Sequence, residues 1–192
     1  MCCAYREEPT VKSDDQLYHE YLAGDQTSGD ELMLRYGEEL MGYLDAFLHN
    51  VHDAEDLMLD VFTIILVDKP KISAGNFRAY LYKVARNKAN RLWRLRFRRS
   101  EFELDEMLPS TEEAPEERAH KAVRDAKLYR CLNRIAPQYR EALYLVYISD
   151  MSYSKAAEVM GCSEKKIDNM LANGKKSMRK ELEKEGLSIE DI

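Results

Sequence analysis

The chain contains few residues that interrupt helices and no long apolar run. Of its 192 residues only 8 are glycine and 5 are proline. No apolar segment approaches the roughly 20 residues needed to span a bilayer. The beginning of the chain also lacks the basic start and the apolar middle of a secretory signal peptide. These absences predict a helical protein that is cytoplasmic and is not inserted in a membrane.

Cysteine is also scarce, with four in the chain. Cys2 and Cys3 are neighbours, and Cys131 and Cys162 fall within helical patterns. Neither a disulfide framework nor the paired spacing of a zinc site is therefore visible. We interpret all four as reduced thiols, and we expect neither a metal nor another cofactor.

Acidic residues are absent from one segment, although the whole chain carries 35 Asp and Glu against 29 Lys and Arg. Eleven Lys and Arg lie between Asp68 and Glu101. A field of one charge sign marks a surface where a polyanion docks, and aromatic rings stack on unpaired bases. Nucleic acid is therefore the first candidate partner. The same segment holds five aromatic residues: Phe77, Tyr80, Tyr82, Trp93 and Phe97.

Apolar residues recur at helical spacing along most of the chain, and no segment alternates convincingly with period two. The pattern predicts an all-α protein, with a first helix capped by Ser13, a second from about Asp30, a third capped by Asp53 and a fourth over 76–99. Residues 100–117 hold eight acidic residues, two prolines and no Lys or Arg, which predicts an extended, flexible acidic linker. Two small helical domains follow, 1–100 and 118–192, with the linker assigned to 101–117.

The helix predicted over 76–99 has two different sides. Its apolar stripe includes Phe77, Leu81 and Ala85, as expected for a side that faces a core. The rings of Tyr82, Trp93 and Phe97 fall instead on the polar side with the cations. Exposed large aromatics need a reason. Stacking on unpaired bases is the favoured interpretation, and packing against the preceding helix is the alternative.

The helix predicted over 53–68 is apolar on nearly every side. Leu57, Val61 and Ile65 form one apolar side, while Leu59 and Phe62 belong to a second. Such a helix must be buried on two sides. Either its own domain encloses it, or a protein partner supplies the second surface.

The C-terminal part carries the outline of a helix-turn-helix, with Ser152 opening a short helix, Gly161 ending it and Ser163 capping another. Ala157 provides the small side chain needed where the helices cross, and Ile167 fills the gap from the second helix. A recognition helix presents its outward side chains to base edges and phosphates. The predicted duplex-reading residues are Ser163, Glu164, Lys165, Lys166, Asp168, Asn169, Asn173, Lys175, Lys176 and Arg179.

Three segments together resemble the extracytoplasmic-function group of bacterial sigma factors, which direct RNA polymerase to promoters. "DAEDLMLDVF" at 53–62 is similar to the polymerase-binding segment of that family. "NFRAYLYKVARNKANRLWRLRFRR" at 76–99 is similar to its promoter-melting segment, and "YREALYLVYISDMSYSKAAEVMGCSEKKIDNML" at 139–171 to its upstream-promoter reader. The segments stand in the family's order, so the resemblance covers nearly the whole chain.

The resemblance implies a non-enzymatic specificity subunit whose partners are core RNA polymerase and promoter DNA, both duplex and melted. An anti-sigma factor is a further partner that is common in the family. The implied contacts to the clamp helices of the polymerase are Asp53, Glu55, Asp56, Asp60 and Phe62. The implied contacts to the minus-ten region are Asn76, Arg78, Tyr80, Lys83, Arg86, Asn87, Asn90, Trp93, Arg94, Phe97 and Arg98.

The chain departs from the family at the usual Gln after the acidic pair, where Leu59 and Asp60 stand, and at Asp168 and Asn169 of the recognition helix. Its promoter sequence therefore does not follow from the resemblance. The alternative function is a helix-turn-helix regulator that never associates with core polymerase, but that function leaves the apolar helix over 53–68 unexplained.

An enzymatic function would need a reactive site. His49 and His52 stand beside Asp53 and Asp56, but a metal site in a helical bundle needs matching ligands from other helices, and no second such pair occurs. We interpret these residues as solvated polar groups.

Overall fold

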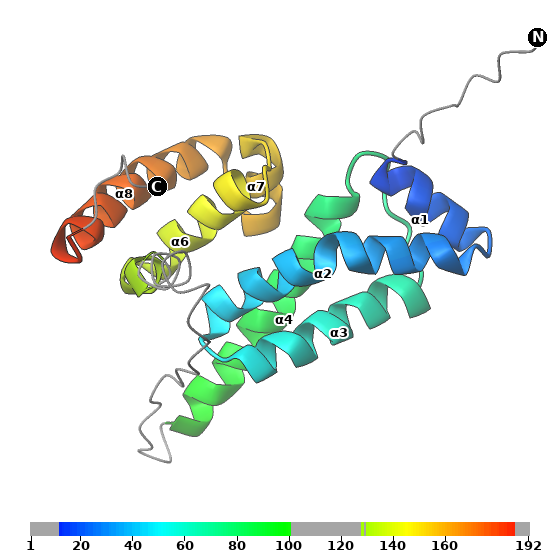
Figure 1. The fold of residues 1–192 in the computed structure, drawn as a ribbon, viewed down its shortest axis with the longest axis horizontal. Coiled ribbons are helices and arrows are strands. Elements are labelled where there is room, and N and C mark those ends of the chain that lie inside the picture. The colour runs from blue at the N-terminus through cyan, green and yellow to red at the C-terminus, as the bar shows by residue number, and fades with distance from the viewer. Residues whose placement is uncertain (1–11, 101–127, 129, 187–192) are drawn as a thin grey trace, which may run out of the picture.

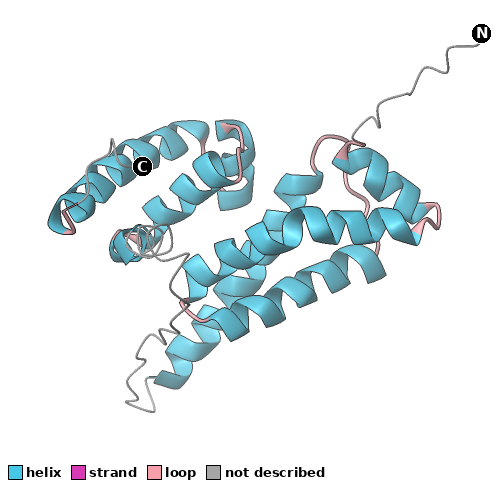
Figure 2. Ribbon diagram, viewed as in Figure 1, coloured by secondary structure: helices cyan, strands magenta, loops and turns pink. Residues whose placement is uncertain are grey.

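A computed structural model describes residues 12–100, 128 and 130–186. Throughout the described residues the regular secondary structure is helical, which confirms the all-α prediction (Figure 2). Within the same residues, no helix has the length and apolar character needed to cross a membrane. The acidic linker predicted at 101–117 lies outside the described part of the chain.

The N-terminal helices are α1 (Asp14–Leu22), α2 (Gln26–Leu48), α3 (Val51–Val67) and α4 (Phe77–Ser100). The long helices α2, α3 and α4 run side by side, and α1 packs across one end of them (Figure 1). Their facing sides form a core of fully buried apolar residues, among them Leu17, Leu32, Leu40, Leu44, Val61, Ile65, Leu81 and Ala85.

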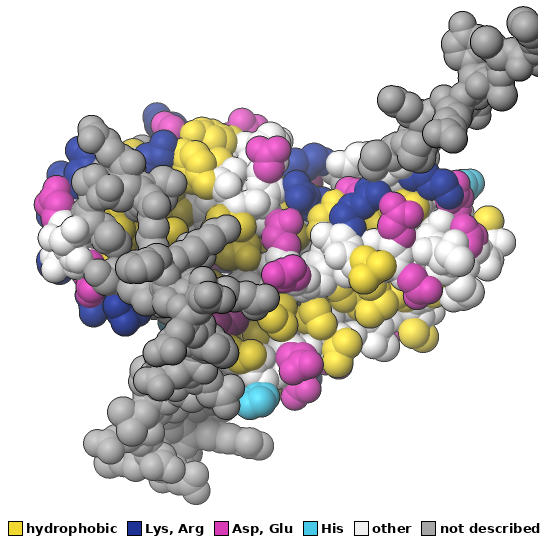
Figure 3. Space-filling model, viewed as in Figure 1, with side chains coloured by type: hydrophobic (Ala, Val, Ile, Leu, Met, Phe, Trp, Pro, Cys, Tyr) yellow, Lys and Arg dark blue, Asp and Glu magenta, His cyan; other side chains and the backbone are white. Residues whose placement is uncertain are grey.

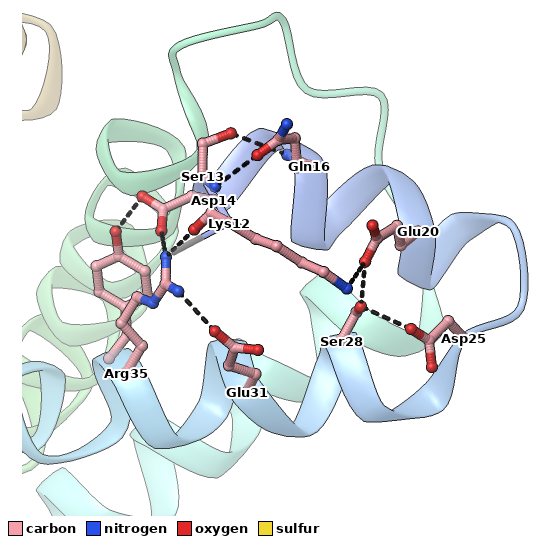
Figure 4. A network of polar contacts seen from close by, with 10 residues as sticks. Lys12, Ser13, Asp14, Gln16, Glu20, Asp25, Ser28, Glu31 and Arg35 are labelled. Carbon is pink, nitrogen blue, oxygen red and sulfur yellow. Dashed lines mark hydrogen bonds and ion pairs between the residues drawn. The ribbon is translucent and has the colours of Figure 1, made fainter. Parts of the chain in front are cut away.

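A polar network fastens α1 to α2 (Figure 4). Ser13 caps α1, as the sequence predicts, because its hydroxyl accepts the amide N–H of Gln16 while the Gln16 side chain accepts the amide N–H of Ser13. Arg35 of α2 donates to Asp14 at 2.8 Å and to Glu31 at 2.7 Å. The start of α1 is therefore held in one position on α2.

Helix α1 in turn fixes the loop that leads into α4. The hydroxyl of Tyr18 donates to the carbonyl oxygen of Pro70 at 2.7 Å, and the amide N–H of Gly75 donates to the carboxylate of Asp15. Burial raises the pKa of Tyr18 to about 12, so this hydroxyl stays protonated at physiological pH. The N-terminal end of the basic helix is thus positioned by hydrogen bonds from α1.

Helix beginnings differ from the sequence prediction at two places. Asp25 caps α2, so the helix begins at Gln26 and not near Asp30. Asn50 caps α3 and accepts the amide N–H of Asp53 at 3.1 Å, so Asp53 lies in the first turn and is not the cap. In both cases a polar side chain a few residues earlier takes the capping position.

The C-terminal helices are a short helical stretch at 130–134, α6 (Pro137–Leu143), α7 (Tyr153–Met160) and α8 (Glu164–Lys184). Pro137 stands in the first turn of α6, where its missing N–H costs nothing. α6 continues without a break into a π-helical turn, η2 (Tyr144–Ile148), in which the N–H of Ser149 donates to the carbonyl oxygen of Tyr144 at 2.9 Å.

The two groups of helices share one continuous hydrophobic core. α7 packs against α4, and α6 packs against α2 (Figure 1). At the centre of this contact the ring of Tyr43 meets the rings of Tyr82 and Tyr144 edge to face, with centroids 5.1 and 5.6 Å apart. Aromatic pairs with this geometry add to the apolar burial. The C-terminal helices are therefore seated on the N-terminal ones.

Candidate nucleic-acid and polymerase interfaces

The helix-turn-helix has the geometry that its sequence predicts. The hydroxyl of Ser152 caps α7, and that of Ser163 caps α8 by accepting the amide N–H of Lys166 at 3.3 Å. Gly161 ends α7 in the left-handed conformation, with φ 64° and ψ 43°. Ala157 and Ile167 are buried where the two helices cross. These contacts fix α8 against α7 with one face turned to solvent.

The outward face of α8 exposes all ten predicted duplex-reading residues. Lys175 has an additional partner, because its ammonium lies 4.7 Å from the centroid of the Tyr147 ring. A hydrogen bond with the Tyr147 hydroxyl raises the pKa of Lys175. Tyr147 itself is exposed. The η2 turn therefore places the Tyr147 ring beside the cationic face of α8.

The C-terminal half of α4 carries an open basic surface. Trp93 is 54% exposed, so its predicted place outside the core is confirmed. A hollow of about 330 Å³ along α4 is lined by Arg86, Asn87, Asn90, Arg91, Arg94 and Leu95. Trp93 lines a second hollow, of about 280 Å³, together with Phe47 of α2 and Pro137 of α6. Phe97 and Arg98 belong to α4, but their side chains lie outside the described residues. This part of α4 thus carries a hollow lined by cationic and amide groups as well as an accessible indole ring.

Tyr82 contradicts the prediction that it lies with the exposed rings. Its side chain is fully buried, its hydroxyl donates to Glu39 at 2.6 Å, and it accepts the hydroxyl of Ser149 at 3.0 Å. Burial, together with the Glu39 hydrogen bond, raises its pKa well above the ordinary value. The physical reason is tertiary, since the C-terminal helices cover this side of α4.

The N-terminal half of α4 has its polar side chains engaged. Arg86 donates to Glu141 at 2.6 Å, Lys83 lies 3.9 Å from Glu158, and Asn76 accepts the Lys155 ammonium. Arg78 pairs with Glu39 at 3.4 Å, and Tyr80 is half-buried. Several residues predicted to meet the minus-ten region therefore meet other parts of the same chain.

Glu141 is a site residue that sequence reasoning missed. Its carboxylate is nearly buried and accepts both Arg86 and the hydroxyl of Tyr43, the latter at 2.9 Å. Burial opposes the charge of Arg86, but the Glu141 carboxylate outweighs it and raises the pKa of Arg86. The only local signal was an acid within the apolar pattern of the 139–147 helix.

The outer face of α3 is acidic and apolar. Glu55, Asp56 and Asp60 are exposed, and Asp53 is half-buried. Phe62 is 2% exposed and packs in the core, so in this structure its side chain does not lie on the outer face of α3 where the sequence placed it. The reason is that neighbouring helices of its own domain enclose this side of α3.

Apolar side chains extend this acidic face over α2 and α3 (Figure 3). Leu34 is 85% exposed, Val67 is 70% exposed and Leu59 is 48% exposed. Isolated exposed leucines are ordinary, but a group beside acids marks a surface suited to a protein partner. Leu34 lies on α2, outside the apolar segment 53–68, so the pattern of that segment does not predict its exposure.

Comparison with known proteins shows which family models and relatives the chain matches. The model of sigma-70 region 2 matches residues 32–99, and that of sigma-70 region 4 matches residues 125–178. The RNA polymerase sigma-H factor of Pseudomonas aeruginosa is 26% identical over 191 residues, covering 91% of this chain and 96% of the relative. The ECF RNA polymerase sigma factor SigM of Bacillus subtilis is 24% identical, covering 78% of this chain and 92% of the relative.

The chain belongs to the extracytoplasmic-function group of bacterial sigma factors. Its fold is similar to that of the sigma factor RpoE of Bartonella quintana, solved in complex with the anti-sigma factor NepR, with a TM-score of 0.70 and 22% identity. That similarity covers 80% of this sigma factor and 96% of the solved chain.

In the described part of the sigma factor, His, Cys, Asp and Glu form no group of three or more that could hold a metal ion. His49 instead lies 2.9 Å from the guanidinium of Arg140 through its Nε2 atom. The pair joins the end of α2 to α6 and belongs to the contact between the two groups of helices.

Proposed function

We propose that this sigma factor binds core RNA polymerase through the outer face of α3, reads upstream duplex with α8 and captures the melted minus-ten strand on α4. One observation carries the proposal. The chain presents two exposed surfaces that are suited to nucleic acid in different ways: the outward face of α8, and the basic helix α4 with its exposed indole. A duplex-binding regulator would need only the first.

The polymerase contact is proposed for Glu55, Asp56 and Asp60, with Leu59 on the same face of α3. These side chains are exposed, and together they form an acidic and apolar surface. Such a surface fits a partner that offers cations around an apolar centre. A regulator that acts without polymerase leaves this face without a purpose.

Strand capture would supply free energy for promoter opening. A base stacked on an aromatic ring is stabilised by about 1–3 kcal/mol, which is comparable with the roughly 1.4 kcal/mol of one DNA stacking step. A few captured bases can therefore shift a nearly balanced melting equilibrium. No covalent step and no cofactor is needed, and the work would be done in the cytoplasm, where the polymerase is.

The domain division proposed from the sequence accompanies this function. Residues 1–100 would form the polymerase-binding and minus-ten domain, and residues 118–192 the upstream-reading domain, joined by 101–117. The matches of region 2 to 32–99 and of region 4 to 125–178 support this division. An anti-sigma factor, such as the one in the solved complex with RpoE, is proposed as an inhibitory partner.

Initiation by the purified chain tests the proposal. Adding it to core polymerase and a genomic template, followed by mapping of transcript starts, should reveal starts that core polymerase alone does not produce. Absence of new starts, together with no binding to core polymerase, would favour the regulator.

Trp93→Ala should impair open-complex formation by roughly tenfold or more, because one stacking contact is lost. Binding of upstream duplex should stay within about twofold, since α8 is untouched. Trp93→Phe is the matched control and should retain most of the activity, because it keeps a ring. Permanganate footprinting measures opening, and an equal loss of opening and of duplex binding would contradict the stacking role.

A further inference from the structure

Asp168 is an acidic residue on the face of α8 that is proposed to meet DNA. Its side chain is exposed, and within the described residues its carboxylate forms neither an ion pair nor a hydrogen bond. Acids near the other end of α8 differ, because Glu181 and Glu185 contact Arg134 at 4.0 and 2.7 Å. Contacts within the fold therefore account for those two acids and not for Asp168.

Three further exposed residues lie in line with Asp168 along α8. Ala172, Lys175 and Arg179 follow it at spacings of four, three and four residues, so the four side chains share one face of the helix. Met170 lies on the other side of the helix and is buried. The exposed face is thus acidic near the start of α8 and cationic further along.

Position along α8 decides what each of these side chains can reach. The first turns of a recognition helix contact base edges in the major groove. Asp168 lies in the second turn, since α8 begins at Glu164. Lys175 and Arg179 stand about two and three turns further on, where cations can neutralise phosphates. Asp168 is therefore placed to meet a base edge.

The chemistry of a carboxylate restricts which base it can meet, because it only accepts hydrogen bonds. In the major groove guanine offers acceptors, thymine offers an acceptor and a methyl group, and adenine offers a donor beside an acceptor. Cytosine offers a donor, its N4 amino group, with no acceptor on its own edge. The phosphates repel the carboxylate whatever the sequence is. Asp168 therefore suits cytosine and opposes the other bases.

We propose that Asp168 is a specificity-determining residue, which accepts a hydrogen bond from the N4 amino group of a cytosine in the upstream promoter element. The inference rests on the proposed function, because it takes α8 as the helix that reads the upstream duplex. At the right base pair the hydrogen bond offsets the repulsion, and elsewhere the unpaired carboxylate weakens binding. Lys175 and Arg179 supply attraction that does not depend on sequence. Base selection and general attraction therefore come from different parts of α8.

Asp168→Asn makes the test sharp. An amide has nearly the shape of a carboxylate, but it carries a donor as well as an acceptor and so matches the N6 and N7 edge of adenine. The side chain is exposed, so the fold should be preserved, which circular dichroism checks. The variant should exchange the preference for cytosine for a preference for adenine. Misfolding cannot produce a gain of this kind.

Two further variants make the test specific. Glu183→Gln is the matched control, because Glu183 is also an exposed acid of α8 but lies fifteen residues, or about 22 Å, further along the helix. It removes the same charge and should leave the base preferences unchanged. Asp168→Ala removes the carboxylate without supplying an amide. It should weaken the preference for cytosine without creating one for adenine.

Transcription from a randomised library measures the preference. Each template carries a start site that core polymerase uses with the wild type, a randomised upstream element and a barcode in the transcribed part. Among transcribed templates the wild type should favour cytosine over adenine by roughly tenfold at one position of the element. Asp168→Asn should favour adenine there by roughly threefold or more, with the other positions unchanged.

Three results would overturn the inference while the proposed function stands. They are a selected upstream sequence that is the same for the wild type and for Asp168→Asn, a change in Asp168→Asn at a position where the wild type does not prefer cytosine, and the same change in Glu183→Gln. A wild type that starts transcription but selects no upstream sequence would instead contradict the proposed reading by α8, and the inference would fall with it.

Discussion

At the scale of single residues, His49 couples the contact between the two groups of helices to pH. It ends α2 in the left-handed conformation, with φ 54° and ψ 35°. Its Nε2 lies 2.9 Å from Arg140, which also donates to Asn133. A guanidinium only donates, so this nitrogen must accept and the ring must be neutral. Burial and the Arg140 charge lower the pKa of His49, and Asp45 opposes this in part.

Acidification should therefore loosen the contact. The lowered pKa means that the neutral ring is favoured when the two groups of helices are in contact. The contribution of His49 is therefore present above the ordinary value of 6.5 and is lost as pH falls through the lower folded value. Below that value His49 and Arg140 would both be cations. Zero-length cross-linking with a carbodiimide would join Lys83 to Glu158 across the contact, where they lie 3.9 Å apart, and Lys88 to Asp60 within the N-terminal helices, where they lie 2.8 Å apart. The ratio of the first link to the second should fall between neutral and mildly acidic pH.

His49→Asn provides the control for this effect. Asparagine tolerates the left-handed conformation and does not titrate, so the backbone should be preserved. The ratio in this variant should vary less with pH than in the wild type. The same pH dependence in both proteins would assign the effect to another group.

At the scale of elements, the turn of the helix-turn-helix depends on a backbone conformation. Gly161 has a φ of 64°, and a β-carbon there would have no atom within 4 Å. Space is therefore not the constraint, and any cost of substitution must come from the dihedral angles. The turn between α7 and α8 therefore depends on the backbone conformation of this residue.

Gly161→Ala should lower the free energy of unfolding by about 1–2 kcal/mol, because alanine enters the left-handed region at that cost. Gly161→Asn should lose clearly less, since asparagine adopts this conformation more readily. Chemical denaturation followed by circular dichroism would compare the variants. Equal losses in both would indicate that something other than the backbone angle matters there.

Local signals explain what could be predicted from the sequence. Ser13, Ser152, Ser163 and Gly161 act on backbone groups only a few residues away, so their roles could be predicted from neighbouring residues. The exposed position of Trp93 followed from the helical period of α4. The ten outward residues of α8 followed in the same way.

Distant partners explain what could not be predicted. Tyr82 falls on the polar side of α4, but Ser149, which is far along the chain, comes to cover it. Phe62 belongs to an apolar side of α3 that its own domain encloses, and periodicity does not say which of two apolar sides is covered. Glu141 shows the same limit. Its burial could not be predicted because its partners, Arg86 and Tyr43, are distant along the chain.

At the scale of the whole molecule, the contact between the two groups of helices and the proposed DNA contacts of α4 exclude one another. Arg86 cannot give the same donors both to Glu141 and to a DNA phosphate. Under the proposed function, α8 and α4 contact separate stretches of promoter DNA. We therefore expect binding to core polymerase and promoter to separate α6 and α7 from α4.

Adding core polymerase should accordingly remove the cross-link between Lys83 and Glu158, while the link between Lys88 and Asp60 persists in part. The loss should grow further when promoter DNA is added. Mass spectrometry of the linked peptides would measure both. Full retention of the first link in a transcribing complex would contradict this account of promoter engagement.

The π-helical turn η2 sets the relative orientation of two side chains that contact α4. Glu141 lies before the turn and holds Arg86, while Ser149 lies after it and holds Tyr82. Deleting one residue within 144–148 would restore α-helical spacing and rotate everything downstream by roughly 100°. The Glu141 and Ser149 contacts to α4 could then not form together. Such a shortened chain would keep both groups of helices but lose the contact that holds them together.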